Sequence, residues 1–369
     1  MKRTLLWLLV LLPLTLVGCK KESGTPTPPP TPTDIPEGTI PVIFHVLYEN
    51  ANNVIQNPRQ AIFEQRIEQL NEFYASTLFP SAGSSAVNIK FTLATHDPDG
   101  NALAEPGINR VAYYGSGNMS AANFLSTRRA LTPQDKSILW DPNRYVNVWL
   151  FGFLVSNDPN QDERYVTGIS YLPYCTSAHP LDKLVTWDAA ITLEPYYMHG
   201  ITLNNAYFRP TTQITDDEGM FTFAHEMGHY LGLLHAFSED GSGCTNPDNA
   251  SDDGCSDTPK YDRDTYQTML YAGSLPYDSY QRQPCDGSAL FTSTNIMDYY
   301  DSYRTNLTPQ QKERIEHVMA YSPWIPRSSS ATKALLENFT YEITDERPEP
   351  ILMYCYGNHY TGSCSGHHH

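Results

Sequence analysis

The sequence predicts a domain of the α/β class, in which strands and helices alternate along the chain. Residues 40–48 (IPVIFHVLY) and 145–153 (YVNVWLFGF) are rich in β-branched and aromatic side chains, which is typical of buried strands. Between them, apolar side chains recur at helical spacing from Phe63 to Tyr74. A second helical stretch, 215–231, contains an unusual group of histidines. Strands and helices are therefore expected together in one domain.

The start of the chain predicts export. Lys2 and Arg3 precede an apolar stretch at 5–16 that is too short to span a bilayer, so residues 1–18 are interpreted as a signal peptide. Cys19 stands where a bacterial lipobox places its acylated cysteine, the alternative being an ordinary secretory signal with a chance cysteine.

Residues 19–38 are rich in proline and threonine and have almost nothing to bury, which predicts a disordered tether. We expect an exported bacterial lipoprotein at the outer membrane or cell surface. Its lipid anchor would be the only contact with the membrane, and its folded part would lie outside the cytoplasm.

The next elements are expected in the following order. Asn57 and Pro58 resemble an N-cap and a first helical residue, and they predict the start of the first helix. Further strands are predicted at 87–94, 145–153 and 167–174, and edge segments or loops at 188–193 and 200–203.

The helix at 215–231 carries the candidate site. Thr215 and Glu218 match a capping box at its start. His225 and His229 are four residues apart, so both project from one face of the helix and can bind one metal ion. Glu226 lies about 100° further round, where a carboxylate could hold a metal-bound water.

His235 can join the other two histidines only if the helix ends between them. A continuous helix would carry it about 15 Å from His225, whereas zinc binds its nitrogen ligands at about 2.0–2.1 Å. Gly232 is placed to end the helix, because glycine accepts a left-handed backbone conformation. The spacing therefore predicts one zinc ion held by three histidines.

The remainder of the chain is less regular. Residues 237–290 are rich in Gly, Ser, Asp and Asn and are expected to be mostly loop, and Thr308 and Pro309 open a last helix. From about residue 328 no clear pattern remains, so the tail at 328–369 has no predicted role.

The amino-acid composition argues against one class of binding partner. The net charge of −17 argues against nucleic acid, whose phosphates require a basic surface. Nothing in the sequence implies an oligomer. Of seven cysteines, six remain once Cys19 is acylated, and they allow 15 disulfide pairings in an oxidising compartment.

The zinc motif followed by TNIMDY at 294–299 resembles the metzincin zinc peptidases. The resemblance implies a twisted mixed sheet with a backing helix and an active-site helix in an upper lobe, 39–235. An irregular lower lobe, 236–327, would hold a methionine turn and the C-terminal helix. It also implies that Met297 packs under the histidines and that Tyr299 approaches the metal or the scissile carbonyl.

The resemblance extends to the pappalysin-like metzincins, over roughly residues 39–325, through IPVIFHVLY, VNIKFTLATHDPDG, GINRV and CSDTP. It implies a secreted endopeptidase acting on protein or peptide substrates, with Glu226 as general base and acid. It also suggests a Cys244–Cys285 disulfide and a calcium ion; separately, a Cys355–Cys364 pair could close the tail. The candidate calcium ligands are Asp248, Asp252, Asp253 and Asp257, and the candidate S1′ specificity residues are Asp298 and Asp301.

Several alternatives stay open. Members of the group often carry a propeptide that blocks zinc through a thiolate or carboxylate. No thiol other than Cys19 precedes the domain here, and Asp34 or Glu37 could supply a carboxylate to the metal, the alternative being a solvated linker charge. A catalytically silent surface binding module and a small-peptide or amidase-type hydrolase are the rival functions. The intact Glu226 argues against the first of them.

Overall fold

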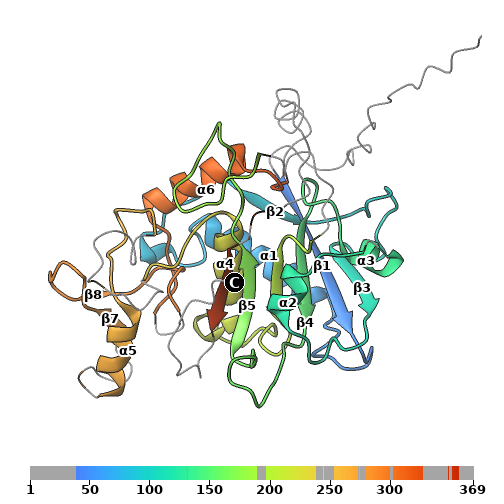
Figure 1. Ribbon diagram of the computed structural model, residues 1–369, viewed down its shortest axis with the longest axis horizontal. Helices are drawn as coiled ribbons and strands as arrows, with labels where there is room; N and C mark the ends of the chain where they lie inside the picture. Colours follow the sequence, from blue (N-terminus) through green and yellow to red (C-terminus); the bar gives the residue numbers. More distant parts are fainter. Residues whose placement is uncertain are drawn as a thin grey trace, which may run out of the picture. The chain divides into compact units, whose positions relative to one another are not determined.

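The computed structural model describes residues 39–130, 132–188, 197–237, 244, 253–272, 274, 280–299, 302–326, 348 and 351–356. A seven-stranded mixed sheet has the order β2-β1-β4-β6-β5-β9, with β3 also paired to β1 (Figure 1). Its strands are β1 (Thr39–Tyr48), β2 (Lys90–Leu93), β3 (Ile108–Ala112), β4 (Val146–Phe151), β5 (Val166–Tyr171), β6 (Ile201–Asn204) and β9 (Leu352–Tyr356).

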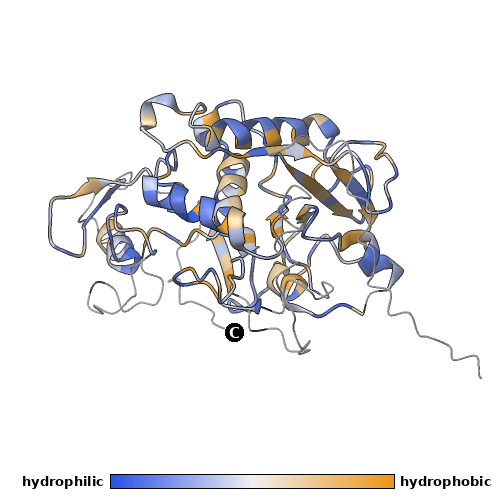
Figure 2. Cartoon of the chain, turned by 90° about the horizontal axis from the view of Figure 1, so that it is seen from above, coloured by the Kyte–Doolittle hydropathy of each residue, from blue (hydrophilic) through white to orange (hydrophobic). Residues whose placement is uncertain are grey.

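The pairs β2–β1, β3–β1, β1–β4 and β4–β6 are parallel, whereas β5 is antiparallel to both of its neighbours, β6 and β9. The inner strands β1, β4, β5 and β6 are buried along nearly their whole length, and Figure 2 shows the strands mainly in the hydrophobic colour. Such burial explains the largely apolar sequences of β1 and β4. A separate two-stranded sheet pairs β7 (Gln281–Arg282) with β8 (Phe291–Thr292).

Two helices pack together against the core of the sheet. These two are α1 (Gln60–Tyr74) and α4 (Glu218–Tyr230); the other α-helices of the described part are α2 (Ala121–Ser126), α3 (Pro133–Ile138), α5 (Arg263–Tyr271) and α6 (Pro309–Tyr321). The Tyr74 hydroxyl of α1 donates to the Ala224 carbonyl of α4 at 3.0 Å. Phe44 of β1 contacts Phe63 of α1 and Phe223 of α4, with ring centroids 5.0 and 5.5 Å apart. The predicted backing helix and motif helix therefore share one core with the sheet.

The starts of the first two predicted helices were wrong by a few residues. Helix α1 begins at Gln60, and Asn57 and Pro58 instead accept hydrogen bonds from Arg110. Helix α4 is capped by Asp217 and not by Thr215, because Asp217 accepts from the Met220 amide.

Asp217 also makes a buried ion pair with Arg66 of α1, at 2.8 Å. The buried Asp217 side chain thus both caps α4 and links it to α1. Thr215 instead lies in a short 3₁₀ turn before α4. The start of α6 was predicted correctly, since Thr308 and Gln311 form a capping box and Pro309 is its first residue.

Three further expectations need correction. The segment at 200–203 is not an edge but the interior strand β6, and residues 189–193 of the other proposed edge lie outside the described part. Helix α5 interrupts the predicted loop region at 237–290. Most importantly, the tail without a predicted role supplies β9, which pairs with β5. Among the described residues, no helix combines the length and apolar character that a bilayer span requires.

Candidate metal and active site

The three histidines of the motif converge at one point. The Nε2 atom of His229 lies 2.9 Å from that of His225 and 3.1 Å from that of His235, and the third Nε2–Nε2 distance is 3.1 Å. All three side chains are buried, as are all residues at 219–230 of α4. The spacing of four residues places the first two on one helix face.

Gly232 forms the turn that lets His235 approach the other two histidines. Helix α4 ends at Tyr230, and Gly232 adopts a left-handed conformation with φ +91°. The Leu233 amide donates to the Gly228 carbonyl at 2.9 Å, a bond that closes the helix C-terminus. A Cβ at Gly232 would also lie 2.6 Å from the Val318 side chain of α6. The predicted turn at this glycine is confirmed.

The histidine ring orientations suit a cation. The Nδ1 atom of His225 lies 2.8 Å from the Ile296 carbonyl, and that of His229 lies 2.7 Å from the Leu233 carbonyl. Because a carbonyl only accepts, each Nδ1 carries the proton and each Nε2 presents a lone pair to the centre of the group. Lone pairs so close repel one another unless a cation lies between them. Three imidazole nitrogens are a donor set that fits zinc.

Burial sets the protonation of these groups. It lowers the pKa of His225 and His229 well below the ordinary histidine value, and the neighbouring histidines lower it further. Both rings are therefore neutral near pH 7, which is the form that binds metals. Burial also raises the pKa of the Glu226 carboxyl well above its usual range.

Glu226 lies beside the histidines, with its side chain against strand β5. Its side chain is fully buried, and neither carboxyl oxygen has a hydrogen-bond partner among the described residues. Gly168 of β5 makes room for it, because a Cβ there would lie 2.8 Å from Oε1. An unpartnered buried carboxylate is costly, which points to a missing ligand such as a metal-bound water.

Met297 packs against α4 as the methionine turn predicts. It is fully buried, and a Cβ at Gly228 would lie 2.6 Å from its sulfur. Its carbonyl accepts from the Ala236 amide at 3.1 Å, and the preceding Ile296 carbonyl holds His225. The turn therefore supports the two ends of the histidine group. Gly228, inside the motif, is a signal for this close approach that sequence reasoning missed.

Tyr299 lies near the histidines, with its ring centroid 4.9 Å from that of His235 and 6.1 Å from that of His225. The guanidinium of Arg263 covers its ring at 4.2 Å. Its hydroxyl donates to the Tyr354 carbonyl of β9 at 2.9 Å. The residue is thus in the expected neighbourhood, but its hydroxyl is engaged by the chain's own tail.

Comparison with known proteins identifies the family. The profile of the family described as pregnancy-associated plasma protein-A matches residues 133–320, which is just over half of the chain. The chain belongs to this family. The predicted resemblance to the pappalysin-like metzincins, a group of metalloproteases, is thereby confirmed.

Relatives and solved structures agree with the family. Extracellular metalloproteases of Arthroderma benhamiae and Trichophyton verrucosum are each 36% identical over 95 residues, 26% of this chain and 29% of theirs. The match therefore spans less than a third of these relatives.

Two structures from Tannerella forsythia resemble the fold. Mature mirolysin in complex with a cleaved peptide has 21% identity and a TM-score of 0.50, covering 82% of this chain and 96% of that one. A promirolysin mutant has 20% identity and a TM-score of 0.52, covering 82% and 85%. The predicted α/β metzincin-like fold is confirmed.

The structure does not place Asp298 in a specificity pocket. Asp298 is buried, accepts hydrogen bonds from Tyr261 at 2.7 Å and from Ser293, and lies 3.8 and 3.5 Å from Arg263 and Arg282. These partners engage both of its carboxylate oxygens and link the methionine turn to α5 and to strand β7. Asp301, the other candidate, lies outside the described residues.

Two of the four candidate calcium ligands, Asp253 and Asp257, lie in the described part of the chain, and both take hydrogen bonds from other protein groups. Asp253 accepts from Cys255 and Thr258, and Asp257 accepts from the Gln310 amide. In the part of the chain that the structure describes, they do not form a group of converging ligand atoms. Asp248 and Asp252 are not among the described residues, and neither is Cys19, the predicted lipidation site.

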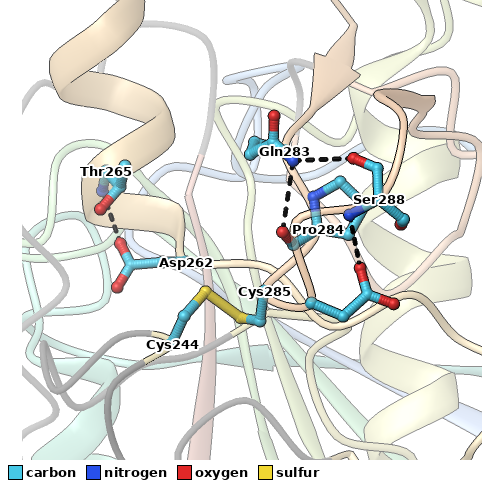
Figure 3. Close-up of a disulfide and its surroundings, with 8 residues drawn as sticks. Cys244, Asp262, Thr265, Gln283, Pro284, Cys285 and Ser288 are labelled. Carbon is cyan, nitrogen blue, oxygen red and sulfur yellow. Dashed lines mark hydrogen bonds between the residues drawn. A yellow bond between two sulfur atoms is a disulfide. The ribbon is translucent and has the colours of Figure 1, made fainter.

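The cysteines were predicted only in part. The expected Cys244–Cys285 disulfide is present, close to Asp262 at the N-cap of α5 (Figure 3). The suggested Cys355–Cys364 pair is wrong, because Cys355 is a buried free thiol. Its sulfur, a carboxyl oxygen of Glu226 and a ring nitrogen of His225 all lie within 4.8 Å of one another. Burial raises the pKa of this thiol, and the nearby Glu226 raises it further.

Proposed function

We propose that the protein is a zinc-dependent endopeptidase that hydrolyses peptide bonds of extended protein or peptide substrates. One observation carries the proposal. Three imidazole nitrogens converge within 2.9–3.1 Å of one another, and a buried carboxyl group without a described hydrogen-bond partner lies beside them. That donor set with an adjacent base is the minimum for hydrolysis by a metal-bound water.

Each residue of the site has a proposed task. His225, His229 and His235 would hold zinc, which when bound supplies a Lewis acid that lowers the pKa of water to about 7. Glu226 would accept the proton of that water and pass it to the leaving amine. Gly168 keeps the space that the carboxyl group occupies, and Met297 supports the helix under the histidines.

Tyr299 would stabilise the oxyanion. The Arg263 guanidinium over its ring fixes the side chain beside His235. Its hydroxyl donates to a backbone carbonyl, that of Tyr354, and a scissile carbonyl oxygen presents the same kind of acceptor. A substrate carbonyl would take this hydrogen bond in place of the tail.

A substrate would bind as an extended strand along β5. This strand carries Gly168 against Glu226, so a peptide paired with it would pass over the base. β-strand addition supplies main-chain hydrogen bonds without demanding particular side chains. The edge of β5 that a peptide would use is now paired with β9.

Digestion of casein and of a peptide library, read by mass spectrometry, tests this function. The wild type, a chelator-treated sample and Glu226→Gln are compared, and Cys355→Ser is assayed in parallel because Cys355 lies at the site. We expect chelator-sensitive cleavage by the wild type or by Cys355→Ser, and a loss of about a hundredfold or more when Glu226→Gln is introduced into the chain that cleaves, the usual range for a general base. Equal turnover by Glu226→Gln would refute its role, and a lack of cleavage by both wild type and Cys355→Ser would favour a binding module.

The location is proposed separately. The relatives named above are extracellular, which supports export of this chain. We propose that Cys19 is acylated and that residues 20–38 tether the domain to the membrane. Labelling of expressing bacteria with a palmitate analogue should mark the wild type and not Cys19→Ser, and equal labelling of both would contradict the anchor.

A further inference from the structure

The tail of the chain occupies the strand position at which a substrate would bind. Strand β9 pairs with β5 in antiparallel register from Leu352 opposite Tyr171 to Tyr356 opposite Val166. The Thr167 hydroxyl donates to the Cys355 carbonyl at 3.2 Å, and Tyr299 donates to the Tyr354 carbonyl. In Figure 1, β9 is the dark red arrow beside β5 and α4. The tail therefore occupies the edge of β5 along which we propose that a substrate binds.

The register aims one side chain of β9 at the site. Cys355 lies directly opposite Gly168, and residues paired across two strands project to the same face of the sheet. That face is the one covered by Glu226, since a Cβ at Gly168 would contact its carboxyl group. The side chains of Met353 and Cys355 are buried, whereas their neighbours in β9 are only partly buried, as strand alternation requires.

Two polar groups of the candidate site lie close to this thiol. The Cys355 sulfur, the Glu226 carboxyl and the His225 ring nitrogen lie within 4.8 Å of one another, whereas the sulfur is not grouped in this way with His229 or His235, so it would move toward these two rings on binding the metal. A second buried thiol, Cys175, is held quite differently, by the Leu184 carbonyl and the Thr186 hydroxyl. Glu226, fully buried without a described hydrogen-bond partner, independently indicates that a ligand belongs here.

We propose that Cys355 is the fourth protein ligand of the metal and that β9 keeps the full-length chain latent. This inference rests on the proposed zinc site. Thiolate is a preferred zinc ligand, and a site with four protein ligands has no open position for water. Formation of the bond releases the thiol proton to solvent, and no oxidant or reductant is needed.

The same strand would exclude substrate in a second way. A peptide and β9 compete for the backbone of β5, and β9 also takes the hydroxyl of Tyr299. Activation therefore requires that β9 leave the sheet. Because the segment follows the domain in the chain, latency here would come from the C-terminal side.

A cobalt-substituted protein tests the ligand without reference to activity. The reduced, desalted full-length chain is loaded with Co²⁺, and its near-ultraviolet spectrum is recorded. We expect a sulfur-to-cobalt charge-transfer band in the wild type and in Cys175→Ser, and its loss in Cys355→Ser. Cys175→Ser is the matched control, because it removes another buried free thiol. A wild-type spectrum without the band overturns the proposal, even if Cys355→Ser fails to fold.

Peptide cleavage then tests latency. Cys355→Ser should cleave a peptide library about tenfold faster than the wild type or more, because one ligand of the closed state is lost. Equal rates in an active wild type would overturn the latency. The two proposals can fail separately. A cobalt–sulfur band with no cleavage by any variant would support Cys355 as a metal ligand and contradict the peptidase function. Chelator-sensitive cleavage without the band would support the peptidase function and contradict Cys355 as a ligand.

Discussion

The sulfur of Met297 lies against Gly228, so closely that a Cβ on the glycine would come within 2.6 Å of it. Met297 is far from Gly228 in the sequence, yet it supports helix α4, which carries His225 and His229. A side chain at position 228 must displace the methionine turn and, with it, the Ile296 carbonyl that orients His225.

Gly228→Ala should therefore destabilise the protein by about 1–3 kcal/mol, the cost of overpacking a core, less up to about 1 kcal/mol from the better helix propensity of alanine. Urea unfolding measures the change. Met297→Ala in the same chain restores space, so the double variant should lose less than the two single changes add up to. Additive losses would show that the contact does not limit this position.

Gly232→Ala should weaken both stability and metal binding. Its φ of +91° disfavours any side chain, and a Cβ would also contact Val318, so His235 is expected to shift. We expect a loss of about 1 kcal/mol or more in unfolding free energy and a measurable fall in zinc affinity by competition with a chelator.

Gly83→Ala is the matched control for that variant. Gly83 has φ +68°, and a Cβ there meets no described atom within 4 Å. The control should lose some stability but keep zinc affinity. If Gly232→Ala also kept full affinity, the turn would not be needed to place His235.

Stability should fall at acidic pH because of His45. Its Nε2 contacts the Asn147 side-chain oxygen at 2.9 Å, and Asn109 donates to its Nδ1 at 2.9 Å, which fixes a neutral ring in the core. Burial lowers its pKa from 6.5 to about 4, while the hydrogen bond to Asn147 opposes this. Between these values the unfolded chain takes up a proton that the folded chain refuses.

The stabilisation from neutral His45 is therefore complete above pH 6.5 and is lost as the pH falls to about 4. The full loss amounts to about 3 kcal/mol, of which about 2 kcal/mol falls between pH 7 and pH 5. Urea unfolding at pH 7 and pH 5 measures it, and His45→Gln, which cannot take up the proton, should show a shallower pH dependence. An unchanged dependence in that variant would assign the acid sensitivity to other groups.

Much of the site was predictable because it is local. The histidine spacing and Gly232 lie within one helix and its C-terminal turn, where elementary geometry decides which side chains meet. The start of α6 could be predicted equally well, because Thr308, Pro309 and Gln311 form a local cap. The start of α4 was not, since Asp217 is chosen by its ion pair with Arg66, which is remote in sequence.

The missed features all depend on distant pairing. The alternation of LMYCY at 352–356 is too short to stand out, and only its register with β5 makes it a strand. Gly168 and Gly228 have roles that appear only when Glu226 and Met297 are placed against them. Asp298 was misread for the same reason, since its buried arginine partners come from α5 and β7.

The metal content of the purified chain tests the central claim most directly. Elemental analysis after dialysis should find a single zinc ion per chain in the wild type and in Glu226→Gln, and far less in His229→Ala, which removes one of the three converging rings. Substoichiometric metal in the wild type, or full zinc content in His229→Ala, would contradict a site built from these three rings.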